Sequence, residues 1–135
     1  MRWLTLILAF GLCGCKSEMQ WQQQWDQERV ALANAPVPTN YKTDIVAFMR
    51  TYLNDPTDVR GAFVSEPAQR EFEGTPRFAS CLRYNAKKGG GQYAGSKDSI
   101  VLYRIGRLDR VVDNARDTCK DAAYLPFPEL ERMTR

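Results

Sequence analysis

The chain has 135 residues, which is enough for one domain of modest size with a short extension. Its 19 Lys and Arg residues and 16 Asp and Glu residues give a formal net charge of +3, which is too small and too scattered to indicate a nucleic-acid partner. The chain contains no His, and this excludes Ser-His-Asp and Cys-His catalysis, His-ligated zinc and pH switching by an imidazole.

The first fifteen residues have the layout of a secretory signal. Arg2 supplies a positive charge, and an uncharged, mainly apolar run follows it from Trp3 to Leu12. This run is too short to span a membrane, which takes about 20 apolar residues. It leads into Leu12-Cys13-Gly14-Cys15, which resembles the lipobox of bacterial lipoproteins, with Leu at −3, a small residue at −1 and Cys at +1.

The resemblance implies that residues 1–14 are a signal peptide and that Cys15 carries a diacylglyceryl thioether and an acylated amine. Cys13 does not fit as the lipid acceptor, because Leu12 would then occupy the −1 position. Lys16 favours the outer membrane, since lipoproteins with Asp at this place tend to stay in the inner membrane of double-membraned bacteria. An ordinary cleaved signal is the alternative. The polar residues after Cys15 argue against a buried N-terminal helix.

Two further cysteines, Cys81 and Cys119, remain once Cys13 is discarded and Cys15 is lipidated. An exported chain folds in an oxidising compartment, so this pair predicts one structural disulfide. A redox pair is the alternative, but redox motifs usually place their two Cys close together as Cys-x-x-Cys.

Residues 15–40 are expected to form a lipidated tether that includes a short amphipathic helix over about 17–33. Trp21 and Trp25 are four residues apart and therefore share a face of this helix. Beside a lipid anchor they are candidates for the membrane interface. Packing against the domain, or exposure on a solvated stalk, are the alternatives. Two prolines within 34–40 favour an extended linker after the helix.

Residues 41–135 predict one α+β domain: a small antiparallel sheet of three to four strands, an N-terminal packing helix and a C-terminal helix. The first helix is expected over 41–54. Its apolar residues recur at intervals of three and four and so form one core face; they are Tyr41, Ile45, Phe48, Met49, Tyr52 and Leu53.

Alternating and β-branched residues predict strands over 59–65, 77–86, 99–105 and 108–112, with a tight turn at Gly106. In the second strand, Phe78, Ser80, Leu82 and Tyr84 form the expected core face. A helix over about 113–123 would bring Cys119 back to Cys81. Its aspartates alternate with basic residues, which favours a solvated, salt-bridged face over a calcium site.

The Gly-rich segment 87–97 is expected to be a flexible loop. It nearly matches a phosphate-binding loop, but Ser96 and Lys97 are exchanged and a strand follows where that motif needs a helix. Nucleotide binding is therefore not expected. The candidate contacts of this loop with an anionic partner are Lys87, Lys88, Tyr93 and Lys97.

No catalytic constellation, metal site or cofactor motif is expected. Glu66, Glu71 and Glu73 lie on an expected loop, and nothing in the sequence fixes their separation as an acid–base pair. The chain resembles the small envelope lipoproteins of double-membraned bacteria, and this resemblance implies a location rather than an activity. We expect a non-catalytic interaction or assembly component on the periplasmic face of the outer membrane. The alternative is a periplasmic binding or inhibitor module that acts on a soluble cell-wall-degrading enzyme.

Overall fold

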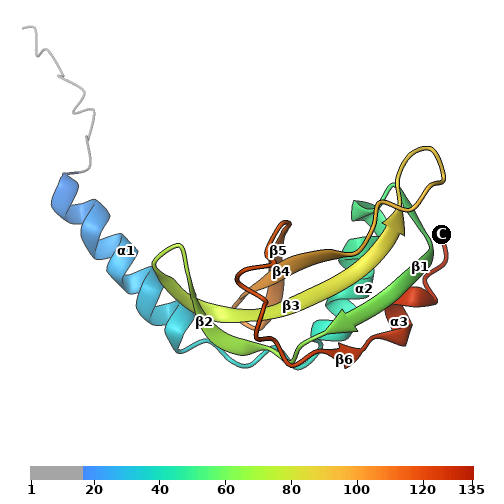
Figure 1. The fold of residues 1–135 in the computed structure, drawn as a ribbon. Helices are drawn as coiled ribbons and strands as arrows, with labels where there is room; N and C mark the ends of the chain where they lie inside the picture. Colours follow the sequence, from blue (N-terminus) through green and yellow to red (C-terminus); the bar gives the residue numbers. More distant parts are fainter. Residues whose placement is uncertain (1–16) are drawn as a thin grey trace, which may run out of the picture.

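A computed structural model describes residues 17–135, so the signal segment, Cys13, Cys15 and Lys16 lie outside the described part of the chain. The described part is α+β with one disulfide, as expected (Figure 1). Its elements, in chain order, are α1 (Glu18–Ala33), α2 (Tyr41–Tyr52), β1 (Asp55–Val64), β2 (Ala68–Phe72), β3 (Thr75–Lys87), β4 (Lys97–Arg104), β5 (Arg107–Val112), β6 (Leu125–Pro126) and α3 (Pro128–Glu131).

The sheet has six strands within residues 17–135, so the expected three to four were too few. Its order is β5-β4-β3-β1-β6, all pairs are antiparallel, and β2 adds to β3 off this path. Strands β1 and β2 pair with successive parts of β3. Between them, Ser65 pairs with Cys81 of β3: the Ser65 hydroxyl accepts a hydrogen bond from the Cys81 N–H at 2.8 Å, and the Ser65 N–H donates to the Cys81 carbonyl oxygen at 2.9 Å. Pro67, which has no N–H to donate, follows within the interruption.

The hairpin β2–β3 replaces the loop that we expected around Glu71 and Glu73. Its turn is formed by Glu73 (φ 50°) and Gly74 (φ 73°), and these two left-handed residues fit a type I′ turn. The expected turn at Gly106 is confirmed, and it has the same form, with Ile105 at φ 48° and Gly106 at φ 77°. The four expected strands are all present within a few residues of their predicted bounds.

The expected helix over 113–123 is wrong, because this segment consists of bends and turns. Asn114 has φ 60°, which is incompatible with the start of a right-handed helix. The Ala115 N–H donates to the Asp98 carbonyl oxygen at 2.9 Å, so the segment hydrogen-bonds to β4. A single turn follows, in which the Cys119 N–H donates to the Ala115 carbonyl oxygen at 2.8 Å. The C-terminal helix is instead α3.

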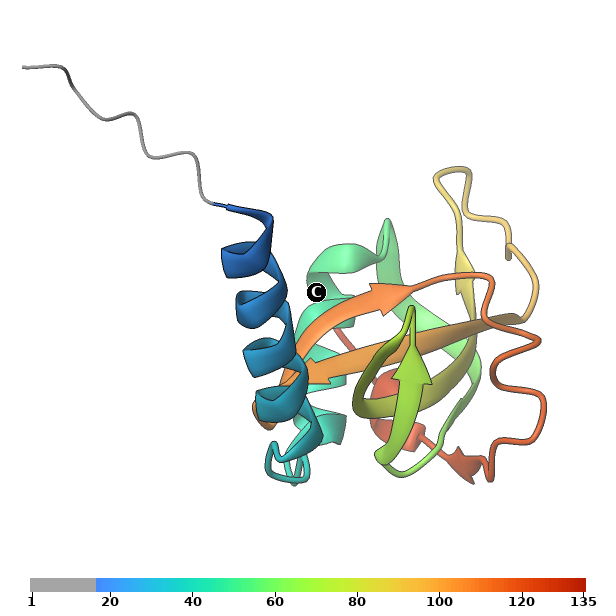
Figure 2. The same cartoon turned by 90° about the vertical axis from the view of Figure 1, so that its left-hand side faces the viewer.

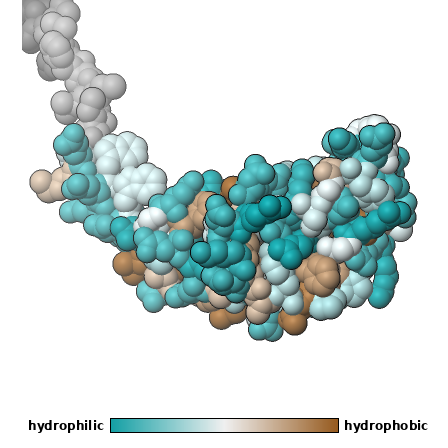
Figure 3. Space-filling model, viewed as in Figure 1, coloured by the Kyte–Doolittle hydropathy of each residue, from teal (hydrophilic) through white to brown (hydrophobic). Residues whose placement is uncertain are grey.

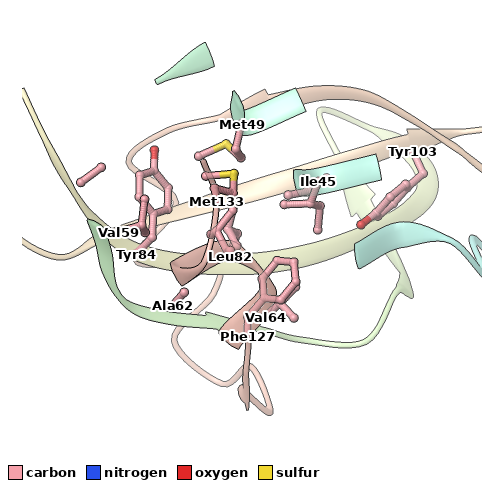
Figure 4. Close-up of a cluster of buried hydrophobic side chains, with 13 residues drawn as sticks. Ile45, Met49, Val59, Ala62, Val64, Leu82, Tyr84, Tyr103, Phe127 and Met133 are labelled. Carbon is pink, nitrogen blue, oxygen red and sulfur yellow. The ribbon is translucent and has the colours of Figure 1, made fainter. Parts of the chain in front are cut away.

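The main core lies between one face of the sheet and helices α2 and α3 (Figure 4). The expected apolar face of α2 supplies it with the fully buried Ile45 and Met49, whereas Tyr52 at the helix end is 44% exposed. Leu82 and Tyr84 of β3 face this core, as expected. The buried Tyr103 hydroxyl is paired there, since it donates to Ser80 Oγ at 3.1 Å.

The opposite face of the sheet carries a second, smaller core beneath the 113–124 segment. The bond between Cys81 and Cys119 joins that segment to β3, with 5.7 Å between the two Cα atoms. The middle of β3 has a core on each face of the sheet. For this reason the consecutive residues 79–82 are all buried, and buried and exposed side chains do not alternate there. The members of this cluster are Ala79, Cys81, Ile100, Leu102, Ala115 and Cys119.

Helix α1 confirms the expected helix but not its amphipathic character, because Leu32 is the one buried residue in it. Figure 2 shows α1 standing beside the end of the sheet where β4 finishes. Its C-terminal half is attached there, since Arg104 Nη1 lies 2.9 Å from Glu28 Oε1 and Gln69 Nε2 donates to the Ala33 carbonyl oxygen.

Replacing both Cys81 and Cys119 by Ala should lower the melting temperature by roughly 15 °C. The bond spans a sequence separation of 38 residues, and the chain-entropy model then gives about 4 kcal/mol of stabilisation. Thermal unfolding followed by circular dichroism, with and without a reductant, measures this effect. The reductant should destabilise the original chain and leave the double variant unchanged. Equal melting temperatures of the original chain in both buffers would contradict the prediction.

Candidate functional site

The glycine-rich loop after β3 is held in place by the residues that we expected to contact a partner. The Arg60 guanidinium lies over the Tyr93 ring, with its carbon 4.1 Å from the ring centroid. The Tyr93 hydroxyl donates a hydrogen bond to the Asp58 carbonyl oxygen at 2.8 Å. Lys87 Nζ pairs with the Asp58 carboxylate, also at 2.8 Å. Tyr93 and Lys87 therefore fix the loop, while Lys88 and Lys97 are exposed and available to a partner.

A hollow of about 180 Å³ lies between this loop and the end of α2. Lys87, Lys88 and Lys97 line it, and Asp113 is the carboxylate among its lining residues. The Tyr52 hydroxyl donates to Asp113 at 2.9 Å, and this hydrogen bond raises the pKa of Tyr52. Burial raises the pKa of the neighbouring Tyr84 to about 12. The hollow is therefore cationic at neutral pH, and both of its tyrosines are protonated.

The two tryptophans of α1 lie on the surface. Trp21 is 48% exposed and Trp25 is 62% exposed, on a helix that also exposes Met19 and Val30. Trp25 lines a cavity between α1 and the β2–β3 hairpin. Trp25 is therefore partly in contact with the domain and partly exposed to solvent. The sequence left these two possibilities open as alternatives.

The cavity beside Trp25, which we call the arginine cleft, escaped the sequence analysis. Its volume is about 350 Å³, and it is lined by Trp25, Glu28, Arg29, Leu32, Phe72, Glu73, Thr75, Arg77 and Arg110. The sequence predicts a loop where the β2–β3 hairpin forms one wall, and a loop does not place these side chains together. The Glu73-Gly74 pair between two short runs of strand-forming residues was the signal that could have revealed it.

Ion pairs partly neutralise the arginine cleft. Arg110 Nη2 lies 3.2 Å from Glu73 Oε2, and both side chains are at least half exposed. Arg77 Nη1 lies 3.3 Å from Asp109 Oδ2, and the Arg77 side chain is only 9% exposed. The Arg77 Nε atom is buried and has no hydrogen-bond partner among the described residues.

The acidic residues considered for acid–base chemistry are not brought together as a pair. Glu66, Glu71 and Glu73 are all exposed. Glu66 lines a separate hollow beside Leu125, whereas Glu73 lines the arginine cleft. Residues 17–135 contain no group of three or more His, Cys, Asp or Glu side chains that could hold a metal ion. No helix in that range is long and apolar enough to cross a membrane.

Comparisons with known proteins reveal no relative of this chain. No family model matches it. Neither the curated proteins nor the solved structures contain a match.

A third charged surface surrounds the ion pair between Arg83 of β3 and Asp98 of β4. Arg83 Nε lies 2.6 Å from Asp98 Oδ1, and Arg83 Nη2 lies 3.0 Å from Asp98 Oδ2. Such a two-point pair fixes both side chains in orientation. Arg116 and Lys120 line the same hollow. The hydrogen bonds from Arg83 lower the pKa of Asp98, whose side chain is 7% exposed.

Replacing Asp98 by Asn should lower the free energy of unfolding at pH 7 by roughly 1–2 kcal/mol, because the charged hydrogen bonds to Arg83 are lost. A carboxylate whose pKa is lowered by folding stabilises the protein above its unfolded pKa. The difference between the two chains should therefore shrink as the pH falls below the ordinary Asp value of 3.8. Urea unfolding of both chains at several pH values from pH 7 to pH 2.5 measures this difference in the free energy of unfolding. A difference that is constant over this range contradicts the assignment.

Proposed function

We propose that the chain is a non-catalytic lipoprotein of the bacterial envelope, attached through Cys15 to the periplasmic face of the outer membrane. The observation that carries this proposal is the order of the chain: the lipobox-like Leu12-Cys13-Gly14-Cys15 ends just before α1 begins at Glu18. A disulfide between the two remaining cysteines supports an oxidising compartment. Multiple acyl chains on Cys15 would hold the protein far more firmly than a single chain.

In this arrangement α1 links the anchor to the sheet. Figure 1 shows the first turns of α1 extending beyond the β2–β3 hairpin. Its 16 residues give a length of about 24 Å at 1.5 Å per residue. Trp21 lies one turn from the start of this helix and Trp25 two turns, so Trp21 would lie nearer the bilayer surface. Aromatic side chains favour that interface because their rings are apolar and their N–H groups remain hydrated.

Replacing Cys15 by Ser should abolish incorporation of labelled palmitate and move the chain out of the membrane fraction, because the acceptor thiol is lost. Replacing Cys13 by Ser is the matched control and should leave both properties unchanged. Expression in a double-membraned bacterium, metabolic labelling and density-gradient separation of the two membranes provide the measurements. Labelling that persists in Cys15→Ser would refute the anchor, and recovery of the original chain with the inner membrane would refute the outer-membrane location.

We propose that the chain contacts another envelope protein through its charged surfaces. On the face in Figure 3, hydrophobic side chains occur as separate spots among hydrophilic ones. The projecting loop after β3 (Figure 1) offers Lys88 and Lys97, on a segment fixed by Tyr93. An exposed cationic loop held by internal contacts suits an acidic partner. It also favours the second candidate function, a module that captures or inhibits a soluble cell-wall-degrading enzyme.

Replacing Lys88 and Lys97 together by Glu should reduce cross-linking to envelope proteins at least fivefold, because like charges would then face an acidic partner. Replacing the exposed Arg50 and Arg132 together by Glu is the charge-matched control, since neither residue lines the hollow beside the loop. Quantitative mass spectrometry of cross-linked membranes measures recovery, and lysis of purified peptidoglycan by soluble cell-wall enzymes measures inhibition. Equal recovery with the loop variant would refute the loop as the contact. Inhibition that the loop variant abolishes would establish the second function.

A further inference from the structure

The arginine cleft has the size and the composition of a small-ligand site. Its volume of about 350 Å³ falls within the range of roughly 300–1,000 Å³ that is typical of ligand pockets. Three segments far apart in sequence form its two walls, with α1 on one side and the β2–β3 hairpin and β5 on the other. It is separate from the hollow beside the loop of residues 87–97, which we call the lysine loop, because the two cavities share no lining residue.

Arg77 is the residue that points to a ligand. Its side chain is more than nine-tenths buried, and it lines the cleft. Asp109 occupies the Nη1 atom at 3.3 Å, but Nε is buried without a partner among residues 17–135. A buried N–H of a charged group without an acceptor is costly, so native structures rarely retain one. The guanidinium therefore retains the capacity to bind a second acceptor beside Asp109.

The charge of the cleft favours a ligand with a single negative charge. Three arginines and two glutamates line it, and Arg29 is exposed and has no ion-pair partner among the described residues. A carboxylate matches the planar guanidinium in shape and would balance this small excess. A phosphate dianion would exceed the excess and would face repulsion from Glu28 and Glu73.

The apolar part of the cleft defines the rest of the ligand. Trp25 and Leu32 from α1 face this space together with Phe72 from β2. The Arg110 guanidinium lies 5.7 Å from the centre of the Phe72 ring, so the charged and aromatic walls adjoin. An aromatic or branched aliphatic group would bury its surface against these three side chains while its acid reaches the arginines.

We infer that the arginine cleft binds a carboxylate attached to an aromatic or branched aliphatic group. Such a group occurs both in small free acids and in the C-terminal residue of a peptide, and the two sources share the chemistry that the cleft recognises. The cleft consists entirely of described residues, so this inference is independent of lipidation at Cys15.

The test uses the full chain in mild detergent, with the tryptophan indole N–H signals observed by NMR. Trp25→Phe assigns the signal of Trp25. N-acetylphenylalanine should shift this signal in a saturable manner, and N-acetylphenylalaninamide, which lacks the charge, should not. Gly-Gly-Phe with a free and with an amidated C-terminus forms the second pair of probes. Binding of the tripeptide alone identifies a peptide end, and binding of the amino-acid derivative identifies a small acid.

Variants distinguish binding by the arginines from nonspecific binding. Arg77→Gln should raise the dissociation constant at least tenfold. Arg29→Gln, at an exposed position that cannot disturb folding, should raise it several-fold. Arg132→Gln should leave it unchanged. Asp109→Asn should lower it, because the competing intramolecular acceptor loses its charge. No saturable shift with either acid, or equal shifts with acid and amide, would overturn the inference, as would tighter binding of inorganic phosphate.

Discussion

The covalent bond between Cys81 and Cys119 is the constraint on which the rest of the structure depends. The segment 113–124 has no continuous helix or strand to hold it in place, yet it covers one face of the sheet. The disulfide attaches it to the centre of β3, and hydrogen bonds from Ala115 to Asp98 and from Arg70 to the Thr118 carbonyl oxygen align it. A chain of this size thereby buries both faces of its central strands with few helices.

Local chemistry explains which parts of the fold the sequence predicted. The apolar period of α2 and the Ile105-Gly106 turn are properties of a few neighbouring residues, and both are confirmed. The segment after β5 misled the analysis because its composition suits a helix, whereas Asn114 adopts a left-handed conformation and Ala115 bonds to β4. Tertiary contacts override local propensity there. Strand β2 was not predicted, because its short run 68–72 shows little of the alternating, β-branched pattern of the other strands, and its pairing with β3 depends on the turn at Glu73 and Gly74.

The two candidate sites also differ in how far the sequence predicted them. The lysine loop is contiguous, so its charge was visible in the sequence, although the internal role of Tyr93 depends on distant Arg60 and Asp58. The arginine cleft draws Arg29, Arg77 and Arg110 from a helix and two strands. No sequence pattern joins these residues, and their convergence depends on the β2–β3 turn that places Glu73 next to Arg110.

The position of α1 connects the two proposals. One end of this helix follows the proposed lipid acceptor, and its other half provides Trp25, Arg29 and Leu32 to the wall of the cleft. A ligand that contacts both walls would bind better when α1 is docked on the sheet, and by linkage it would stabilise that docking. Leu32 is the single buried residue of α1, so a ligand that contacts both walls would add to the apolar surface that is buried between this helix and the sheet.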